Sequence, residues 1–261
     1  MYGRQIAAAN GGAAIGILGG LIGLGGAEFR LPLLISAFRF GALEAVILNK
    51  AMSLIVVVTA LLFRTRVVPL ATVAANWPIV VNLLAGSLVG AYVGAGWAMR
   101  LKSETLFKTI AALLVVIAGF LLFGHGVEGT SAPALSGFAL ILAGAIAGFL
   151  IGVVASLMGV AGGELLIPTL ILLFGADIKL AGSLSLAVSL PTMLVGFARY
   201  SRDQSFSVIG RNRSFAVCMA LGSVLGGAIG AHLLGIVPEW ILLPGLALIL
   251  LVSAFKVWGH K

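Results

Sequence analysis

Long apolar runs constrain this chain more than any other feature of its sequence. Ala45–Phe63, Leu106–Phe123 and Ile241–Val252 are almost free of charge, and the mean hydropathy is +1.20. About 20 apolar residues span a bilayer as a helix, and a helix satisfies its own backbone groups in lipid. Only 9% of the residues are charged, against about 25% in an ordinary soluble domain. The sequence therefore predicts an all-α polytopic membrane protein in contact with the lipid bilayer.

The basic residues indicate membrane orientation and not binding of nucleic acid. The net charge is +8, but the Lys and Arg residues lie mostly in the short polar segments between apolar runs. Cytoplasmic loops of membrane proteins are enriched in these residues. The single cysteine, Cys218, excludes an internal disulfide. We predict no nucleic-acid partner, no metal site and no cofactor.

A repeat runs through the chain. Residues 21–34 (LIGLGGAEFRLPLL) align with residues 157–170 (LMGVAGGELLIPTL) at the offset that separates Glu28 from Glu164, which is 136 positions. The same offset aligns residues 86–95 with residues 222–231. Richness in Gly, Ala and Leu does not by itself keep a Glu and a Pro in register. We predict two homologous transmembrane repeats, 1–124 and 137–261, joined by a linker at 125–136.

Each repeat holds a broken apolar segment followed by three simpler helices. Glycines recur every four residues in the second of these helices and form one smooth stripe, which favours close helix–helix approach. The stripes consist of Gly86, Gly90 and Gly94, and of Gly222, Gly226 and Gly230. The predicted helices are 45–63, 71–98 and 105–123 in the first repeat, and 180–198, 214–235 and 239–257 in the second.

The broken segments allow two topologies. As one straight helix, residues 137–174 would measure about 57 Å, nearly twice the hydrocarbon thickness of about 30 Å. We therefore expect the glycines to turn the chain, so that each broken segment is a re-entrant hairpin ending on the side where it began. An odd number of crossings per repeat then inverts the two repeats, and we favour this arrangement over a parallel eight-span repeat.

Loop charge supports the hairpin topology. It places 11 basic residues on the side of the termini and 3 on the other, a stronger asymmetry than the eight-span alternative gives. We expect the termini to be cytoplasmic. The residues on their side are Arg4, Arg39, Arg100, Lys102, Lys108, Arg199, Arg202, Arg211, Arg213, Lys256 and Lys261, and those on the other side are Arg64, Arg66 and Lys179.

Two half-helices that begin inside the membrane would form an anion site. One is expected at Ala27–Glu28 and the other at Gly163–Glu164, and each exposes unpaired backbone N–H groups at the positive end of its dipole. Polar residues of the following helices could complete the site. The candidate substrate-binding residues are Gly23, Gly25, Gly26, Ala27, Glu28, Asn49, Lys50, Ser53, Gly159, Gly162, Gly163, Glu164, Ser183, Ser185 and Ser189.

The two glutamates have three interpretations. A carboxylate at membrane depth is costly and by default indicates function. Glu28 and Glu164 would repel an anion when ionised and not when protonated, which suggests proton coupling. Each could instead cap its own half-helix, or form an ion pair with Lys50 or Arg30.

The motif G-x-G-G-x-E-x-x-x-P, repeated as G-x-A-G-G-E-x-x-x-P, resembles the sulfite exporter TauE/SafE family, as does Leu48–Asn49–Lys50. The resemblance covers essentially the whole chain. It implies transport of small anions, often sulfur-containing, such as sulfite, sulfonates and sulfoacetate, across the bacterial inner membrane. Ala27 and Ala161 replace glycines of the fullest form of the motif. The matching residues are Gly23, Gly25, Gly26, Glu28 and Pro32, and Gly159, Gly162, Gly163, Glu164 and Pro168.

We predict a secondary carrier in which the two repeats move around a central anion site, with protons as the expected coupling ion. A passive anion channel shares the same site chemistry and remains an alternative. An intramembrane enzyme with Ser156 as nucleophile and His232 as base is disfavoured, because the repeat places Gly20 and Gly96 at the equivalent positions. The chain is thus not expected to be an enzyme. Substrate identity, direction of transport and oligomeric state stay open.

Overall fold

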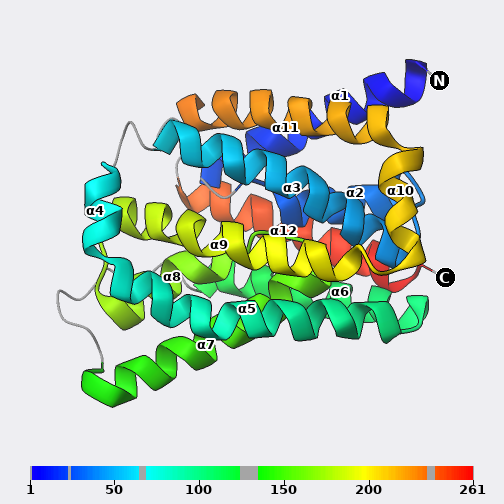
Figure 1. Cartoon of the computed structure of the whole chain (residues 1–261). Helices are drawn as coiled ribbons and strands as arrows, with labels where there is room; N and C mark the ends of the chain where they lie inside the picture. Colours follow the sequence, from blue (N-terminus) through cyan, green and yellow to red (C-terminus); the bar gives the residue numbers. More distant parts are fainter. Residues whose placement is uncertain (1, 23–24, 65–68, 124–134, 234–238, 261) are drawn as a thin grey trace.

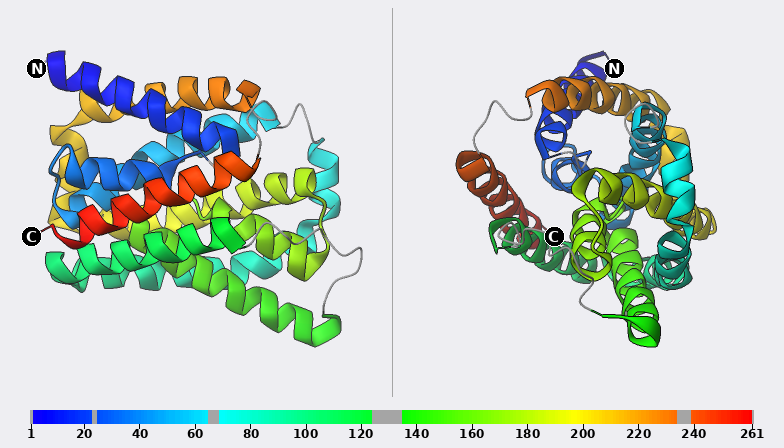
Figure 2. Two further views of the ribbon diagram at one scale, coloured as in Figure 1. Left: turned by 180° about the vertical axis from the view of Figure 1, so that it is seen from behind. Right: turned by 90° about the vertical axis from the view of Figure 1, so that its left-hand side faces the viewer.

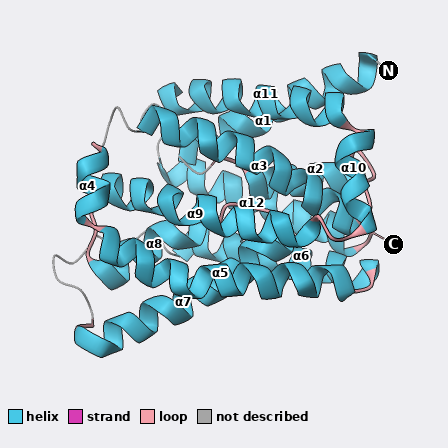
Figure 3. Ribbon diagram, viewed as in Figure 1, coloured by secondary structure: helices cyan, strands magenta, loops and turns pink. Residues whose placement is uncertain are grey.

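The long α-helices lie side by side roughly along one direction, and short helices run across the two ends of the bundle (Figures 1 and 3). The structure, a computed structural model, describes residues 2–22, 25–64, 69–123, 135–233 and 239–260, and no strand occurs among them. Five of the described helices are long and apolar enough to cross a membrane, at Ala42–Leu62, Trp77–Arg100, Gly137–Met158, Ile178–Tyr200 and Arg213–Leu233. The prediction of an all-α, multi-pass membrane protein is confirmed.

The first half of the chain differs from the predicted elements at one point. The helix expected at 71–98 is divided at Asn76, because Pro78 has no N–H to donate to the carbonyl of Ala74 and its ring would clash with that carbonyl in a continuous helix. Its elements are α1 (Tyr2–Ile22), α2 (Ala27–Ser36), α3 (Ala42–Arg64), α4 (Leu70–Ala75), α5 (Trp77–Arg100) and α6 (Ser103–Phe123).

The second half breaks where the glycine motif predicts. The helix that starts at Gly137 ends at Met158, and a new helix starts at Gly163, so residues 137–174 do not form one rod. The elements are α7 (Gly137–Met158), α8 (Gly163–Phe174), α9 (Ile178–Tyr200), the 3-10 helix η2 (Gln204–Phe206), α10 (Ser207–Arg211), α11 (Arg213–Leu233) and α12 (Glu239–Trp258).

The two helices of each broken segment return to the end of the bundle where they began. Figure 2 shows both chain ends at one end, here named the termini end, and α4 at the other, the α4 end. Arg4, near the start of α1, stacks over the ring of Phe40, which follows α2, at 5.1 Å, so this hairpin opens at the termini end. Phe174, the last residue of α8, lies against Gly144 in the first part of α7, so the second hairpin opens at the α4 end.

Glycine faces join helices from opposite halves of the chain. Helix α1 lies along α11, and α5 lies along α7. A Cβ on Gly222 or Gly226 would overlap the carbonyl oxygen of Ala9 or Ala13, and one on Gly90 would overlap that of Phe149. The predicted close approach at the glycine stripes is therefore confirmed, and its partners are the helices that precede the two breaks.

Helices α3 and α9 contact each other between these two pairs. Helix α3 also contacts α11, and α9 also contacts α5. Both helices carry buried polar residues in the middle of the bundle, including Asn49, Lys50 and Ser53 on α3 and Ser185 and Ser189 on α9. The breaks between α1 and α2 and between α7 and α8 meet these residues.

Candidate functional site

Each half-helix starts after a glycine in the left-handed conformation. Gly26 precedes α2 with φ 70°, and Gly162 precedes α8 with φ 80°. Residues with a Cβ disfavour this conformation, whereas glycine adopts it freely. The predicted starts of the half-helices, at Ala27 and Gly163, are confirmed. Gly23, another candidate, lies outside the described residues.

Asn49 joins the two breaks. This fully buried α3 residue donates from Nδ2 to the carbonyl oxygen of Ala27 at 3.0 Å and to that of Met158 at 3.1 Å. Gly159, which follows Met158 with φ 68°, packs against the backbone of Val46 on α3. The two broken segments, far apart in the sequence, therefore meet across one helix.

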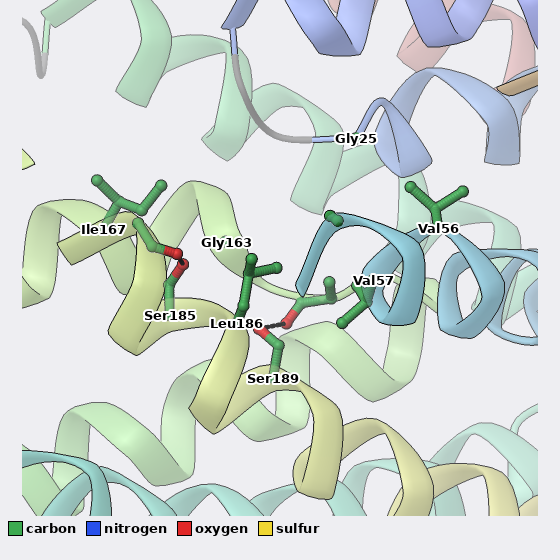
Figure 4. A pocket seen from close by; sticks show the side chains of 11 residues that line it. Gly25, Val56, Val57, Gly163, Ile167, Ser185, Leu186 and Ser189 are labelled. Atoms are coloured by element: carbon green, nitrogen blue, oxygen red, sulfur yellow. Dashed lines mark hydrogen bonds between the residues drawn. The ribbon is translucent and has the colours of Figure 1, made fainter. Parts of the chain in front are cut away.

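A small cavity lies where the breaks meet (Figure 4). Its volume of about 70 Å³ is room for a few waters or one small anion. Its walls come from both breaks, from the second half of α3 and from the first half of α9, so it lies toward the α4 end. The lining residues are Gly25, Val56, Val57, Ala60, Ala161, Gly163, Ile167, Gly182, Ser185, Leu186 and Ser189.

Two of the three candidate serines of α9 line the cavity, and the third is buried elsewhere. Ser185 Oγ donates to the carbonyl of Gly182 at 2.9 Å, and Ser189 Oγ donates to that of Ala161 at 2.8 Å. Both line the cavity, as Figure 4 shows. Ser183 donates to the carbonyl of Lys179 on its own helix and is not among the lining residues. To bind an anion, Ser185 and Ser189 have to turn their hydroxyl protons from these carbonyls into the cavity.

Glu28 and Glu164 lie buried near each other. Their exposed fractions are 1% and 7%, and they are close enough for their charges to interact. Neither side-chain oxygen of Glu28, nor Oε1 of Glu164, has a hydrogen-bond partner among the described residues. The two carboxyl groups have each other as neighbouring hydrogen-bonding groups, and burial of carboxylates without a cationic partner is costly.

The ion-pair interpretation of the glutamates fails in this structure, whereas the capping interpretation stays a prediction. The ion pairs found among the described residues are Lys108–Glu104 and Arg211–Glu44, so neither Glu28 nor Glu164 pairs with Arg30 or Lys50. The residues that precede α2 and α8 are glycines and offer no side chain as a cap. Glu28 and Glu164 lie in the first turn of each half-helix, where the helix dipole favours a carboxylate, so capping by these side chains stays a prediction.

Arg30 is fully buried and held by neutral side chains from two other helices. Its Nε donates to Asn49 Oδ1 at 2.9 Å, Nη2 donates to Ser53 Oγ at 2.9 Å, and Nη1 donates to Ser223 Oγ at 3.3 Å. Asn49 and Ser53 therefore bind Arg30 and do not line the cavity. The sequence analysis missed Ser223, although it interrupts the glycine stripe of its helix one position after Gly222.

Lys50 points away from the cavity to the end of α7. Its Nζ donates to the carbonyl oxygen of Ala155 at 3.3 Å and to Ser156 Oγ at 3.4 Å. Tyr200 Oη donates to the carbonyl of Ser156 at 2.8 Å. Tyr200 was also missed, because an aromatic residue at the end of a span is typical of the membrane interface.

Comparison with known proteins finds one family. The family model described as Sulfite exporter TauE/SafE matches residues 7–257, which is nearly the whole chain and includes both breaks. Comparisons with curated proteins and with solved structures give no match.

Proposed function

Because the chain belongs to the sulfite exporter TauE/SafE family of membrane transporters, we propose that it is a secondary carrier for small sulfur-containing anions of the sulfite, sulfonate or sulfoacetate type. The observation that carries this proposal is the meeting of two half-helix starts at one buried cavity. Gly25 precedes one start, Gly163 begins the other half-helix, and both line that cavity.

The cavity has the chemistry that an anion requires. Helix N-termini present backbone N–H groups and the positive end of the dipole, and glycines let a ligand approach the backbone closely. Ser185 and Ser189 supply two hydroxyl groups at the wall. Arg30 and Lys50 do not line the cavity. Both are held close to the breaks, so their positive charges favour an anion there.

The same offset of 136 positions supports inverted repeats that alternate in access. It relates α1 to α7, α2 to α8 and α5 to α11. The two hairpins open at opposite ends of the bundle. In carriers of this construction, rigid movement of one repeat against the other exposes a central site to each side in turn. We assign residues 1–124 and 137–261 to the two repeats.

Charge asymmetry supports a cytoplasmic location for the termini end, in the inner membrane of a bacterium. Lys179 stands at the start of α9, at the α4 end. The cavity then faces the periplasm in this state. The basic residues at or next to the termini end are Arg4, Arg39, Arg100, Lys102, Lys108, Arg199, Arg202, Arg211, Arg213 and Lys256.

Glu28 and Glu164 are the proposed proton carriers. Ionised, the two carboxylates repel an anion in the adjoining cavity, and protonated they do not. Their burial and their closeness to each other, without a cation paired to either, support this role. Anion and proton would then bind together and cross together.

Flux into proteoliposomes tests the proposal. Purified protein should take up radiolabelled sulfite or sulfoacetate, and an inward proton gradient should accelerate the uptake. A carrier also exchanges internal for external anion with saturable kinetics, whereas a passive channel shows no such exchange. Absence of movement for any sulfur-containing anion would overturn the transport proposal, and unchanged flux under a proton gradient would remove the coupling.

A further inference from the structure

The positions that line the cavity have equivalents in the other half of the chain, 136 residues away. At these equivalent positions a side chain occupies the space. Leu186 on α9 and Ala60 on α3 line the open cavity. In the other half of the chain, the position equivalent to Leu186 is Lys50 on α3, 136 residues earlier. The position equivalent to Ala60 is Gly196 on α9, 136 residues later. Lys50 is fully buried and Gly196 is buried too.

The side chain of Lys50 occupies the corresponding space. A Cβ placed on Gly196 would lie 2.8 Å from Lys50 Cε and 3.0 Å from Lys50 Nζ, which is closer than real contacts allow. Gly196 therefore has to be glycine for Lys50 to lie where it does. At the open cavity, the position equivalent to Gly196 is Ala60. Its methyl group is accommodated there because the cavity separates it from Leu186.

Tyr200 closes this location toward the termini end. It follows Gly196 by one helical turn on α9, and its ring is fully buried. Its hydroxyl donates to the carbonyl of Ser156, the residue whose Oγ accepts from Lys50. Lys50, Ser156 and Tyr200 thus form one buried contact between α3, α7 and α9.

The ammonium of Lys50 is poorly compensated. It has three N–H donors, and its two acceptors are neutral atoms at 3.3 and 3.4 Å. Neither ion pair found among the described residues involves it. The carbonyl end of α7 favours a cation, but a negative ion forms a stronger hydrogen bond with an ammonium. An anion that reached Lys50 would therefore attract it away from α7.

We propose that Lys50 is a movable cation, which fills the termini side of the site in this structure and binds the transported anion when that side opens. The proposal rests on the alternating access proposed above. Movement of the side chain away from Ala155 and Gly196 would open a cavity equivalent to the one beside Leu186. The ammonium would then exchange the α7 carbonyl for the anion as its partner.

Thiol accessibility tests this role without any anion, which matters because sulfite itself attacks thiol reagents. In a Cys218→Ser background, Val57→Cys reports on the open cavity, and Met193→Cys, 136 positions on and packed in the same cluster as Val57, reports on access for a reagent added from the termini side. We expect an impermeant thiol reagent to label Val57→Cys from the α4 side. From the termini side, Met193→Cys should react at least tenfold more slowly.

Two further substitutions should move the termini-side reporter in opposite directions. Gly196→Ala removes the space for Lys50 and should raise the reactivity of Met193→Cys at least tenfold. Lys50→Met keeps the bulk without the charge, so the reporter should stay unreactive and anion exchange should fall at least tenfold. Lys102→Met, on an exposed lysine between α5 and α6, is the matched control and should change neither measurement.

Normal exchange in Lys50→Met would overturn the proposal. So would an unreactive Met193→Cys in Gly196→Ala, provided that the variant keeps its thermal stability. If Gly196→Ala does not fold, Lys50→Ala takes its place, since it empties the same volume and should also raise reactivity. If the unsubstituted protein moves no sulfur anion, the proposed function fails, while the difference in reactivity still decides the role of Lys50.

Discussion

Glu28 and Glu164 face each other in the middle of the bundle, although 136 positions of sequence separate them. Each lies in the first turn of a half-helix, and each is buried. This carboxylate pair is the proposed route of the coupled protons. This relationship leads to the first prediction.

Glu28→Gln and Glu164→Gln should each abolish acceleration of uptake by a proton gradient, because glutamine is a permanent stand-in for the protonated acid. Exchange of internal for external anion needs no net proton movement and should persist. Measuring uptake with and without a proton gradient, and anion exchange in the same proteoliposomes, distinguishes loss of proton coupling from loss of anion transport. Glu104→Gln, on an exposed glutamate paired with Lys108, is the control. A gradient response that survives in both variants would show that the protons move elsewhere.

Asn49→Ala should destabilise the protein strongly. The substitution removes the acceptor for Arg30 Nε and the donor to Ala27 and Met158. A buried polar group left without a partner costs about 1–3 kcal/mol, and three groups lose one here. Thermal unfolding in detergent should shift downward by several degrees. Asn10→Ala, at an exposed position of α1, should leave the transition near its original temperature.

Neighbouring glycines of α11 should respond differently to the same substitution. A Cβ on Gly226 would overlap the Ala13 carbonyl of α1, whereas one on Gly227 would lie 3.8 Å from Gly16 O, an ordinary contact. Gly226→Ala should therefore separate the helices and lower the unfolding temperature. Gly227→Ala should be neutral or stabilise by up to about 1 kcal/mol, since Ala is the better helix former. Equal effects of the two substitutions would contradict the described packing of α1 on α11.

The left-handed glycines before the half-helices should also resist substitution. Gly26→Ala and Gly162→Ala each force a Cβ into that conformation at a cost of about 1–2 kcal/mol. Gly26→Ala should cost more, because its Cβ would also lie 2.6 Å from the Ile15 carbonyl. Gly119→Ala on α6, where nothing lies within 4 Å, is the control for thermal stability. We expect the largest loss of thermal stability for Gly26→Ala, a smaller loss for Gly162→Ala and the smallest for Gly119→Ala.

Cysteines at two exposed positions, one at each end of the bundle, test the orientation. In a Cys218→Ser background, Arg39→Cys between α2 and α3 should be labelled from the cytoplasm, and Lys179→Cys at the start of α9 from the periplasm. Impermeant reagents added to right-side-out and inside-out vesicles distinguish the two sides. Labelling of both cysteines from one side would exclude the arrangement of the hairpins proposed here.

Local chemistry explains which parts of the fold the sequence could predict. Gly26 and Gly162 mark the starts of α2 and α8. Glycine adopts the left-handed conformation that ends one helical direction and begins another, so a glycine cluster in an apolar segment predicts a break there. The division at Asn76 escaped prediction because the apolar pattern continues past it, although Pro78 was a usable signal. The glycine stripes predicted close approach but not the partner, since a smooth helix face accepts any other.

The candidate site was predictable in position and not in detail. Glycines and glutamates fix where two half-helices begin, and these residues do meet. Long side chains such as those of Arg30 and Lys50 can reach several partners, so the sequence could not assign them. The outcome is that Ser185 and Ser189 line the cavity, while Asn49 and Ser53 hold Arg30 beside it.

The pairing of α1 with α11 also limits how early during synthesis the protein can complete its fold. Helix α1 ends at Ile22, but its partner starts only at Arg213. At 5–20 residues per second, the glycine face of α1 stays uncovered for roughly 10–40 seconds of translation. Helix α5, by contrast, meets α7 as soon as the next long helix after α6 is inserted. The first half of the chain therefore cannot finish folding before most of the second half has left the ribosome.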